Sequence, residues 1–257
     1  MARLEIDLTG KVCVVTGGSR GLGKHMCEAF AAHGADVVVA SRKEDACVAL
    51  AEAITADTGR QAMGIAFHAG RWDDAQRLYD ATLERFGRID VLVNNAGMSP
   101  LYPSLDAVTE DLWDKVIGVN MKGPFRLAAL AGTHMRDSGN GGSIINVSSI
   151  AAVEPSPAEL PYGMAKAGLN ALTIGLARAF GPTVRVNTIM PGPFLTDISK
   201  AWDLDSFNKM AKVNIPLQRG GEPHEVVGAA LYFASDASSY TTGAILKIDG
   251  GSARAPA

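Results

Sequence analysis

The chain has 257 residues, of which 47 % are hydrophobic and 20 % charged, and its formal net charge at pH 7 is −3. This length and composition fit one folded α/β domain and exclude a disordered or fibrous chain. No long basic run offers a surface for nucleic acid, and no apolar stretch approaches the roughly 18 residues of a membrane span. The N-terminal segment also lacks the apolar core of a signal peptide, so we expect a cytoplasmic protein that binds neither nucleic acid nor membrane.

Short β-rich runs alternate with amphipathic segments along the whole chain. Strands are predicted at residues 12–16, 36–40, 62–67, 89–94, 143–147, 184–189 and 245–248. Helices are predicted at residues 21–33, 44–58, 73–86, 162–180 and 222–234, with a further helical region over 112–137. Strands that alternate with helices form parallel βαβ units. We therefore expect an α/β fold with a doubly wound, seven-stranded parallel sheet of Rossmann type and helices on both faces.

No linker or internal repeat divides the chain, which predicts a single domain over residues 1–257 with a flexible tail over 251–257. Two segments that follow strands, residues 150–161 and 192–213, are too long for ordinary turns. Ligands bind beyond the carboxyl ends of the strands in such sheets. We expect both segments to border a ligand, and the second to act as a lid.

A glycine-rich turn, Thr16-Gly17-Gly18-Ser19-Arg20-Gly21-Leu22-Gly23, joins the first strand to the first helix. Glycines allow backbone N–H groups and a helix N-terminus to approach a pyrophosphate without interference from a Cβ atom. The turn therefore indicates a dinucleotide-binding site, although a tight turn without a ligand would have a similar sequence.

Residues 17–21 also match the G-x-S-x-G pattern of a hydrolase, with Ser19 as the nucleophile. An α/β-hydrolase needs several strands before its nucleophile, whereas only 18 residues precede Ser19. A hydrolase is therefore a remote alternative.

Tyr162 and Lys166 are four residues apart, so a helix places both side chains on one face. Ser149 lies thirteen residues before Tyr162, just after the strand at 143–147. These three polar groups can converge at one edge of the sheet. An isolated tyrosine beside a solvated lysine remains the alternative for this pair.

Together with Asn94-Asn95-Ala96-Gly97 after the fourth strand, Asn120, and Pro191-Gly192-Pro193-Phe194-Leu195-Thr196, these motifs resemble the short-chain dehydrogenase/reductase family over essentially the whole chain. The resemblance implies one domain that both binds the dinucleotide and catalyses oxidation or reduction, as a carbonyl reductase does. It implies that Tyr162 is the general acid/base, Ser149 hydrogen-bonds the substrate oxygen, Lys166 binds the nicotinamide ribose and Asn120 anchors a water-linked proton path.

The chemistry of these residue types agrees with those roles. A phenol with a pKa of about 10 is ionised only about one part in a thousand at pH 7. A pKa lowered by ~3 units would require ~4 kcal/mol of differential stabilisation. Lys166 and a positive nicotinamide ring are the expected sources of that stabilisation.

The cofactor contacts that we predict are Gly17, Ser19, Arg20, Gly21, Leu22, Gly23, Ser41, Arg42, His68, Asn94, Ala96, Gly97, Tyr162, Lys166, Pro191, Gly192 and Thr196. His68 stands where the family often has an adenine-binding aspartate, and a strand-end histidine without a ligand is equally open.

The segment after the second strand, Ser41-Arg42-Lys43, is basic where an NAD-selective site carries an acidic residue. Arg42 can meet a 2′-phosphate with a planar fork of donors, so we predict NADP(H) as the cofactor. The alternative is that Arg42 and Lys43 only lie at a solvated helix start.

The expected function is hydride transfer between NADP(H) and a carbonyl or secondary alcohol. The side chains expected around the substrate are largely apolar. An apolar pocket of this kind predicts a hydrophobic ketone or a 3-ketoacyl thioester, and a sugar or polyol is the alternative substrate. A catalytically silent NADP(H) sensor is disfavoured because Ser149, Tyr162 and Lys166 are all present. The expected pocket residues are Met98, Leu101, Tyr102, Val153, Phe194, Ile198, Trp202, Leu204, Phe207 and Met210.

Two further expectations concern metals and assembly. The five histidines and three cysteines show no ligand spacing, so we predict no metal and reduced cysteines in the core. The helix predicted at 162–180 carries many small residues that permit close approach of another helix. The resemblance to the family implies that subunits pair through this helix. We therefore expect a homo-oligomer, either a tetramer or a dimer. The small residues are Gly163, Ala165, Ala167, Gly168, Ala171, Gly175 and Ala177.

Overall fold

The computed structural model of the chain describes residues 6–197, 199 and 203–254. Its centre is one sheet of seven parallel strands in the order β3-β2-β1-β4-β5-β6-β7. The chain reverses its direction of travel across the sheet between β1 and β4, the point beyond which such sheets bind ligands. The predicted doubly wound fold is confirmed. The strands are β1 (Val12–Thr16), β2 (Asp36–Ser41), β3 (Ala62–Ala66), β4 (Val91–Asn94), β5 (Gly142–Val147), β6 (Val184–Pro191) and β7 (Ile245–Ile248).

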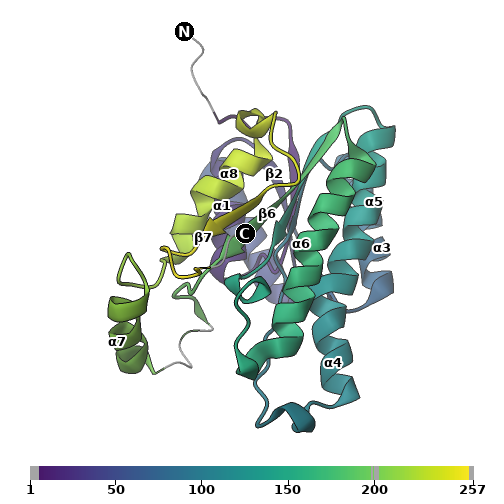
Figure 1. Cartoon of the computed structure of the whole chain (residues 1–257). Helices are drawn as coiled ribbons and strands as arrows, with labels where there is room; N and C mark the ends of the chain where they lie inside the picture. Colours follow the sequence, from purple (N-terminus) through teal and green to yellow (C-terminus); the bar gives the residue numbers. More distant parts are fainter. Residues whose placement is uncertain (1–5, 198, 200–202, 255–257) are drawn as a thin grey trace.

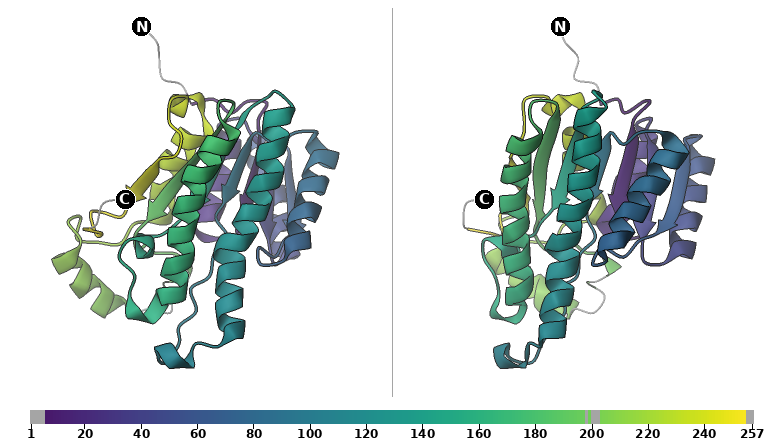
Figure 2. Two further views of the ribbon diagram at one scale, coloured as in Figure 1. Left: turned by 45° about the vertical axis from the view of Figure 1, so that its right-hand side comes forward. Right: turned by 90° about the vertical axis from the view of Figure 1, so that its right-hand side faces the viewer.

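Helices cover both faces of the sheet (Figure 1, Figure 2). One face packs against α1 (Gly21–Ala32), α2 (Glu44–Thr58) and α8 (Val227–Ala234). The other packs against α3 (Trp72–Phe86), α5 (Gly123–Asp137) and α6 (Leu160–Phe180). Within the part of the chain that the structure describes, no helix is both long and apolar enough to cross a membrane.

The core consists of two apolar layers, one on each side of the sheet. Because successive side chains of a strand point to opposite faces, Cys13 and Val15 pack with α1, while Val12 and Val14 pack with α5. All three cysteines are buried and free, as predicted. Burial on both faces explains why the strands are continuous apolar runs.

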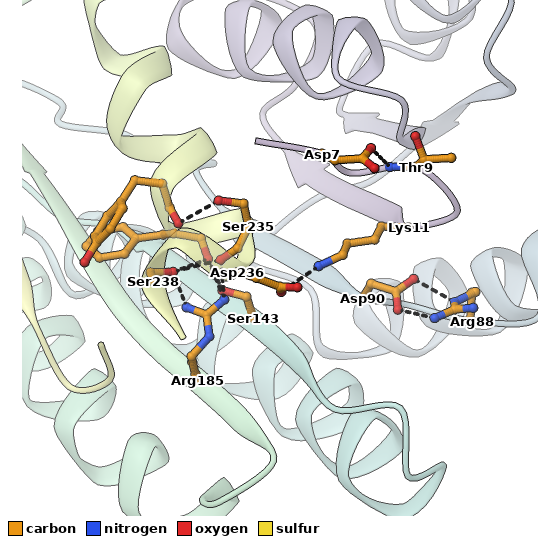
Figure 3. A network of polar contacts seen from close by, with 12 residues as sticks. Asp7, Thr9, Lys11, Arg88, Asp90, Ser143, Arg185, Ser235, Asp236 and Ser238 are labelled. Carbon is orange, nitrogen blue, oxygen red and sulfur yellow. Dashed lines mark hydrogen bonds and ion pairs between the residues drawn. The ribbon is translucent and has the colours of Figure 1, made fainter. Parts of the chain in front are cut away.

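Polar contacts fasten the amino-terminal edge of the sheet (Figure 3). Arg185 donates to the backbone oxygens of Phe233 at 3.0 Å and Ser235 at 3.1 Å, at the end of α8. Asp90 accepts a hydrogen bond from the backbone N–H of Val12 at 2.9 Å and pairs with Arg88. These contacts hold the edge opposite to the one where ligands are expected.

Two predicted segments differ from the structure. Residues 192–213 were expected to be a loop, but they contain most of α7 (Leu204–Asn214). This helix begins because the Asp203 side chain accepts hydrogen bonds from the backbone N–H groups of Asp205 and Ser206, each at 3.2 Å, and so caps its first turn. The helical region at 112–137 is divided into α4 (Glu110–Ile117), a π-turn (Gly118–Lys122) and α5.

The expected flexible tail is tied to the domain as far as residue 254. Asp249 accepts from the backbone N–H groups of Gly251 at 2.9 Å and Ala253 at 2.8 Å, and Glu154 accepts from that of Arg254 at 2.6 Å. Side-chain carboxylates therefore accept the hydrogen bonds of backbone N–H groups that lie outside any helix or strand. Residues 255–257 of the predicted tail lie outside the described residues.

Candidate active site

The glycine loop lies at the carboxyl edge, by which we mean the edge of the sheet where β1, β4 and β5 end. Gly17 has φ +66° and Gly21 has φ +53°, a region that favours glycine. A Cβ atom on Gly23 would lie 2.3 Å from the backbone oxygen of Gly17, so only glycine fits there. Arg20 starts α1 without any side-chain cap, which leaves the first N–H groups of the helix for a ligand.

A threonine hydroxyl joins this loop to the end of β4. Thr16 accepts hydrogen bonds from the backbone N–H groups of Asn95 at 3.0 Å and Ala96 at 3.1 Å. The Asn95 amide in turn donates to the backbone oxygens of Thr16 at 2.9 Å and Gly17 at 3.2 Å. Sequence reasoning missed this role of Asn95, although the second asparagine of Asn94-Asn95-Ala96-Gly97 was a visible indication of it.

The Asn94 side chain turns away from the carboxyl edge. It is 2 % exposed and donates to Asn146 at 2.9 Å, inside the sheet. Asn146 continues the chain of hydrogen bonds to Thr173 of α6 at 2.8 Å. The amide N–H groups of Asn94 are thus used inside the domain, and its cofactor contact stays a prediction.

The end of β2 forms the outer rim of the glycine loop. The hydroxyls of Ser19 and Ser41 are 2.8 Å apart, and Ser41 lies 3.0 Å from the Cys47 sulfur. Arg42 and Arg20 are exposed beside them. The described contacts of Ser19 thus include a serine hydroxyl and no histidine, which does not suit a hydrolase nucleophile.

His68 lies beyond β3, where its ring stabilises a turn. Its Nδ1 accepts a hydrogen bond from the backbone N–H of Gly70 at 3.2 Å, and its own backbone N–H donates to Asp74 at 2.9 Å. Nδ1 is therefore an acceptor, which leaves the proton of a neutral ring on Nε2. That N–H is the group with which His68 can contact a ligand.

Ser149, Tyr162 and Lys166 converge at the carboxyl edge, as their spacing predicts. The Ser149 hydroxyl lies close enough to the Tyr162 phenol to lower the pKa of that phenol by hydrogen bonding. The Lys166 ammonium donates to the backbone oxygen of Val147 at 2.7 Å and lies 5.7 Å from the centre of the Tyr162 ring. Ser149 is the second residue after strand β5, and α6 supplies the other two side chains.

Burial sets the acidity of the two α6 groups. It lowers the pKa of Lys166 to about 7, because the charged ammonium loses its water. Burial also raises the pKa of Tyr162 to about 12, against the opposing effect of the Ser149 hydrogen bond, and the Glu159 charge raises it further. The lowered phenol pKa that we expect from Lys166 and a bound nicotinamide ring together concerns the protein with its cofactor and stays a prediction.

Asn120 lies in the π-turn between α4 and α5 and is fully buried. Its amide donates to the backbone oxygens of Met98 at 2.8 Å and Val116 at 3.0 Å, and its oxygen accepts from the N–H of Met98 at 3.2 Å. A Cβ atom on Gly97 would lie 3.1 Å from the Asn120 oxygen and 3.6 Å from the Lys166 nitrogen. Asn120 is therefore close to Lys166, but its side-chain amide already hydrogen-bonds backbone groups of Met98 and Val116.

The segment after β6 returns to the glycine loop. Pro191 ends β6, and the backbone N–H of Gly192 donates to Ile248 at 2.9 Å. A Cβ atom on Gly21 would lie 3.6 Å from the Thr196 Cβ, so this segment and the glycine loop are neighbours. The structure thus brings predicted cofactor residues from β1, β4 and β6 to one place.

The predicted apolar pocket is only partly assembled. Phe194 is 7 % exposed and belongs to the core, whereas Leu101 is 83 % exposed. Leu204 and Met210 are exposed on α7, and Met98, Tyr102, Val153 and Phe207 are half-buried. Ile198 and Trp202 lie outside the described residues.

These residues fit a nicotinamide dinucleotide. The Lys166 ammonium has three donors, and the described contacts use one of them, on Val147. The remaining donors suit ribose hydroxyls, while the uncapped start of α1 suits a pyrophosphate.

Comparisons with known proteins agree with this geometry. A family model described as Enoyl-(Acyl carrier protein) reductase matches residues 17–253. The chain is 38 % identical over 251 residues to an L-rhamnose 1-dehydrogenase (NAD(P)(+)) of Azotobacter vinelandii, covering 95 % of this chain and 97 % of the relative. The chain belongs to the short-chain dehydrogenase/reductase family, and it is an oxidoreductase that acts on CH–OH or C=O groups with a nicotinamide cofactor.

Two solved structures are close in fold. L-sorbose reductase from Gluconobacter frateurii, complexed with NADPH and L-sorbose, has a TM-score of 0.91 at 28 % identity and covers 98 % of this chain and 100 % of its own. A 3-oxoacyl (acyl-carrier-protein) reductase from Agrobacterium tumefaciens with NADP bound has a TM-score of 0.90 at 30 % identity and covers 97 % of each chain.

Replacement of Lys166 by methionine should change how stability depends on pH. The pKa of Lys166 falls from its ordinary 10.5 to about 7 in the folded chain, so between these values the unfolded chain binds more protons and the wild type gains stability as the pH rises. Urea unfolding of both proteins without cofactor should show their free-energy difference moving by about 3–4 kcal/mol in favour of the wild type between pH 7 and 10. A difference independent of pH would contradict the burial of a titrating lysine.

Proposed function

We propose that this protein transfers a hydride between NADP(H) and a carbonyl or secondary alcohol carbon held beside Tyr162. The convergence of Ser149, Tyr162 and Lys166 at the carboxyl edge is the observation that carries the proposal. The bound nicotinamide would supply or accept the hydride. Ser149 would orient the substrate oxygen by a hydrogen bond, and the Tyr162 phenol would exchange the proton of that oxygen.

Lys166 would hold the nicotinamide ribose with its free donors. Its ammonium would also favour the ionised phenol, because opposite charges nearby stabilise each other. Asn120 would keep the backbone around Met98 and Gly97 in place and so support the water-linked proton path implied by the family. The other proposed cofactor contacts are those predicted above.

NADP(H) is the proposed form of the cofactor. Arg20 and Arg42 are exposed and follow Ser19 and Ser41 directly in the sequence, and the hydroxyls of these two serines are 2.8 Å apart. Guanidinium groups and hydroxyls can both donate hydrogen bonds to a 2′-phosphate. The NADPH-bound and NADP-bound relatives support this choice, whereas the rhamnose dehydrogenase, named for NAD(P)(+), leaves NAD open.

Two substrate classes are supported by different observations. Met98 and Val153, half-buried near the site, favour a hydrophobic ketone, and the 3-oxoacyl reductase relative favours a 3-ketoacyl thioester. A sugar or polyol is favoured by the relatives that are named for L-rhamnose and L-sorbose. Assembly into a homo-oligomer through α6 and a cytoplasmic location remain predictions from the sequence.

Tyr162→Phe should remove nearly all turnover, because the variant lacks the proton that the substrate oxygen exchanges. Acid/base groups of this kind typically contribute about 10²–10⁴-fold. NADPH binding, followed by fluorescence titration, should stay close to that of the wild type. The matched control is Tyr240→Phe, which removes a hydroxyl from a fully exposed tyrosine. Retention of more than about a tenth of the turnover, with chemistry rate-limiting, would refute the role of Tyr162.

Arg42→Ala should weaken NADPH binding about ten- to a hundredfold, since a hydrogen bond to a charged group contributes ~1.5–3 kcal/mol. NADH lacks the phosphate, so its affinity should hardly change. Lys43→Ala, at the next position, removes the same charge and should have a smaller effect on NADPH. Titration of both cofactors against the three proteins decides the assignment, and tighter binding of NADH than NADPH by the wild type would overturn it.

A further inference from the structure

A half-buried carboxylate lies beside the proposed proton donor. Glu159 immediately precedes α6, three residues before Tyr162, and Ser99 donates to its Oε2 at a distance of 3.4 Å. Within the described part of the chain, Glu159 forms no ion pair with a lysine, arginine or histidine. Its charge acts on the Tyr162 phenol, whose pKa it raises.

Hydrogen bonds fix the backbone on both sides of this carboxylate. The Tyr102 hydroxyl donates to the backbone oxygen of Pro157 at 2.7 Å and accepts from the backbone N–H of Leu160 at 2.9 Å. Ser156 caps the short turn between them by accepting from Ala158 at 3.2 Å. The backbone on both sides of Glu159 is thus fixed, and Glu159 is a neighbour of Tyr102 and Tyr162.

The role of helix cap does not account for the Glu159 side chain. It makes no hydrogen bond to the first N–H groups of α6, although it occupies the N-cap position. Glu159 is half-buried, and this partial burial raises its pKa because the ionised carboxylate loses part of its water. One long hydrogen bond from Ser99 leaves most of its acceptor positions open.

We propose that Glu159 and Ser99 form a subsite for a hydroxyl group of the substrate on a carbon near the one that reacts. A hydroxyl donates to the carboxylate and accepts from the serine, so it complements both groups. An apolar ketone offers no such donor, and on binding beside Glu159 it would displace water from the carboxylate without replacing its hydrogen bonds. The subsite therefore selects a polyhydroxylated substrate, a sugar or a polyol, from the two classes considered above. This inference rests on the proposed function of the same site.

The experiment compares two substrates in three enzymes. Wild type, Glu159→Leu and Glu159→Gln are assayed with NADP⁺ on a polyol and on an apolar secondary alcohol, and the ratio of the two kcat/KM values is measured. A change in the acidity of Tyr162 affects both substrates and cancels in this ratio. Glu52→Gln, which removes an exposed carboxylate in α2, is the control. NADPH affinity shows that each variant is folded.

The wild type should prefer the polyol, and Glu159→Leu should lower the ratio about ten- to a hundredfold, as expected for loss of a hydrogen bond to a charged group. Glu159→Gln keeps an acceptor oxygen and should lower the ratio less. An equal loss with both substrates, or no change in the ratio, would overturn the inference. So would a wild type that prefers the apolar alcohol, although the proposed function would then stand. Failure to oxidise any alcohol or reduce any ketone would overturn both.

Discussion

The burial of Lys166 is the constraint on which the site depends. Its ammonium lies in the interior of the domain and donates to Val147 at 2.7 Å, so the end of β5 and the first turns of α6 have one fixed relative position. The same contact aligns Ser149, which follows β5, with Tyr162, one turn before Lys166. The cost of this burial is visible in the lowered pKa of the lysine. A ligand that brings hydroxyl acceptors to the ammonium would offset that cost, which ties the stability of the site to cofactor binding.

The fold was largely predictable because burial on both faces makes each parallel strand an apolar run. Strands β1 and β7 have the predicted bounds, and the others differ by a few residues. Helix α7 was missed because it is amphipathic but largely exposed, with Ala211 as its one buried residue, and Asp203 caps it from within an irregular segment. The hydrogen bond that the backbone of Arg254 makes was not predictable, because its acceptor, Glu154, is distant in the sequence.

The positions of the site residues followed from spacing, but their environments did not. Spacing placed Ser149, Tyr162 and Lys166 together, since strand ends and helix faces are periodic. It could not give the pKa of the Tyr162 phenol, which burial raises to about 12. Nor could spacing distinguish the two asparagines. The side chain of Asn94 is buried against Asn146, whereas that of Asn95 hydrogen-bonds the backbone of the glycine loop. Tyr162 is therefore a weak acid in the protein without cofactor. We expect the bound cofactor to supply the positive charge that lowers the pKa of Tyr162.

Transfer of deuterium from the cofactor to the substrate would demonstrate hydride transfer at this site. The protein is incubated with NADPH fully deuterated at nicotinamide C4 and with a panel of ketones, 3-ketoacyl thioesters and ketoses, and the products are analysed by mass spectrometry. The account predicts that at least one carbonyl compound is reduced with one deuterium on the new alcohol carbon, and that Tyr162→Phe abolishes this product. An alcohol formed without deuterium, or no reduced product from any compound while NADPH binds, would contradict it.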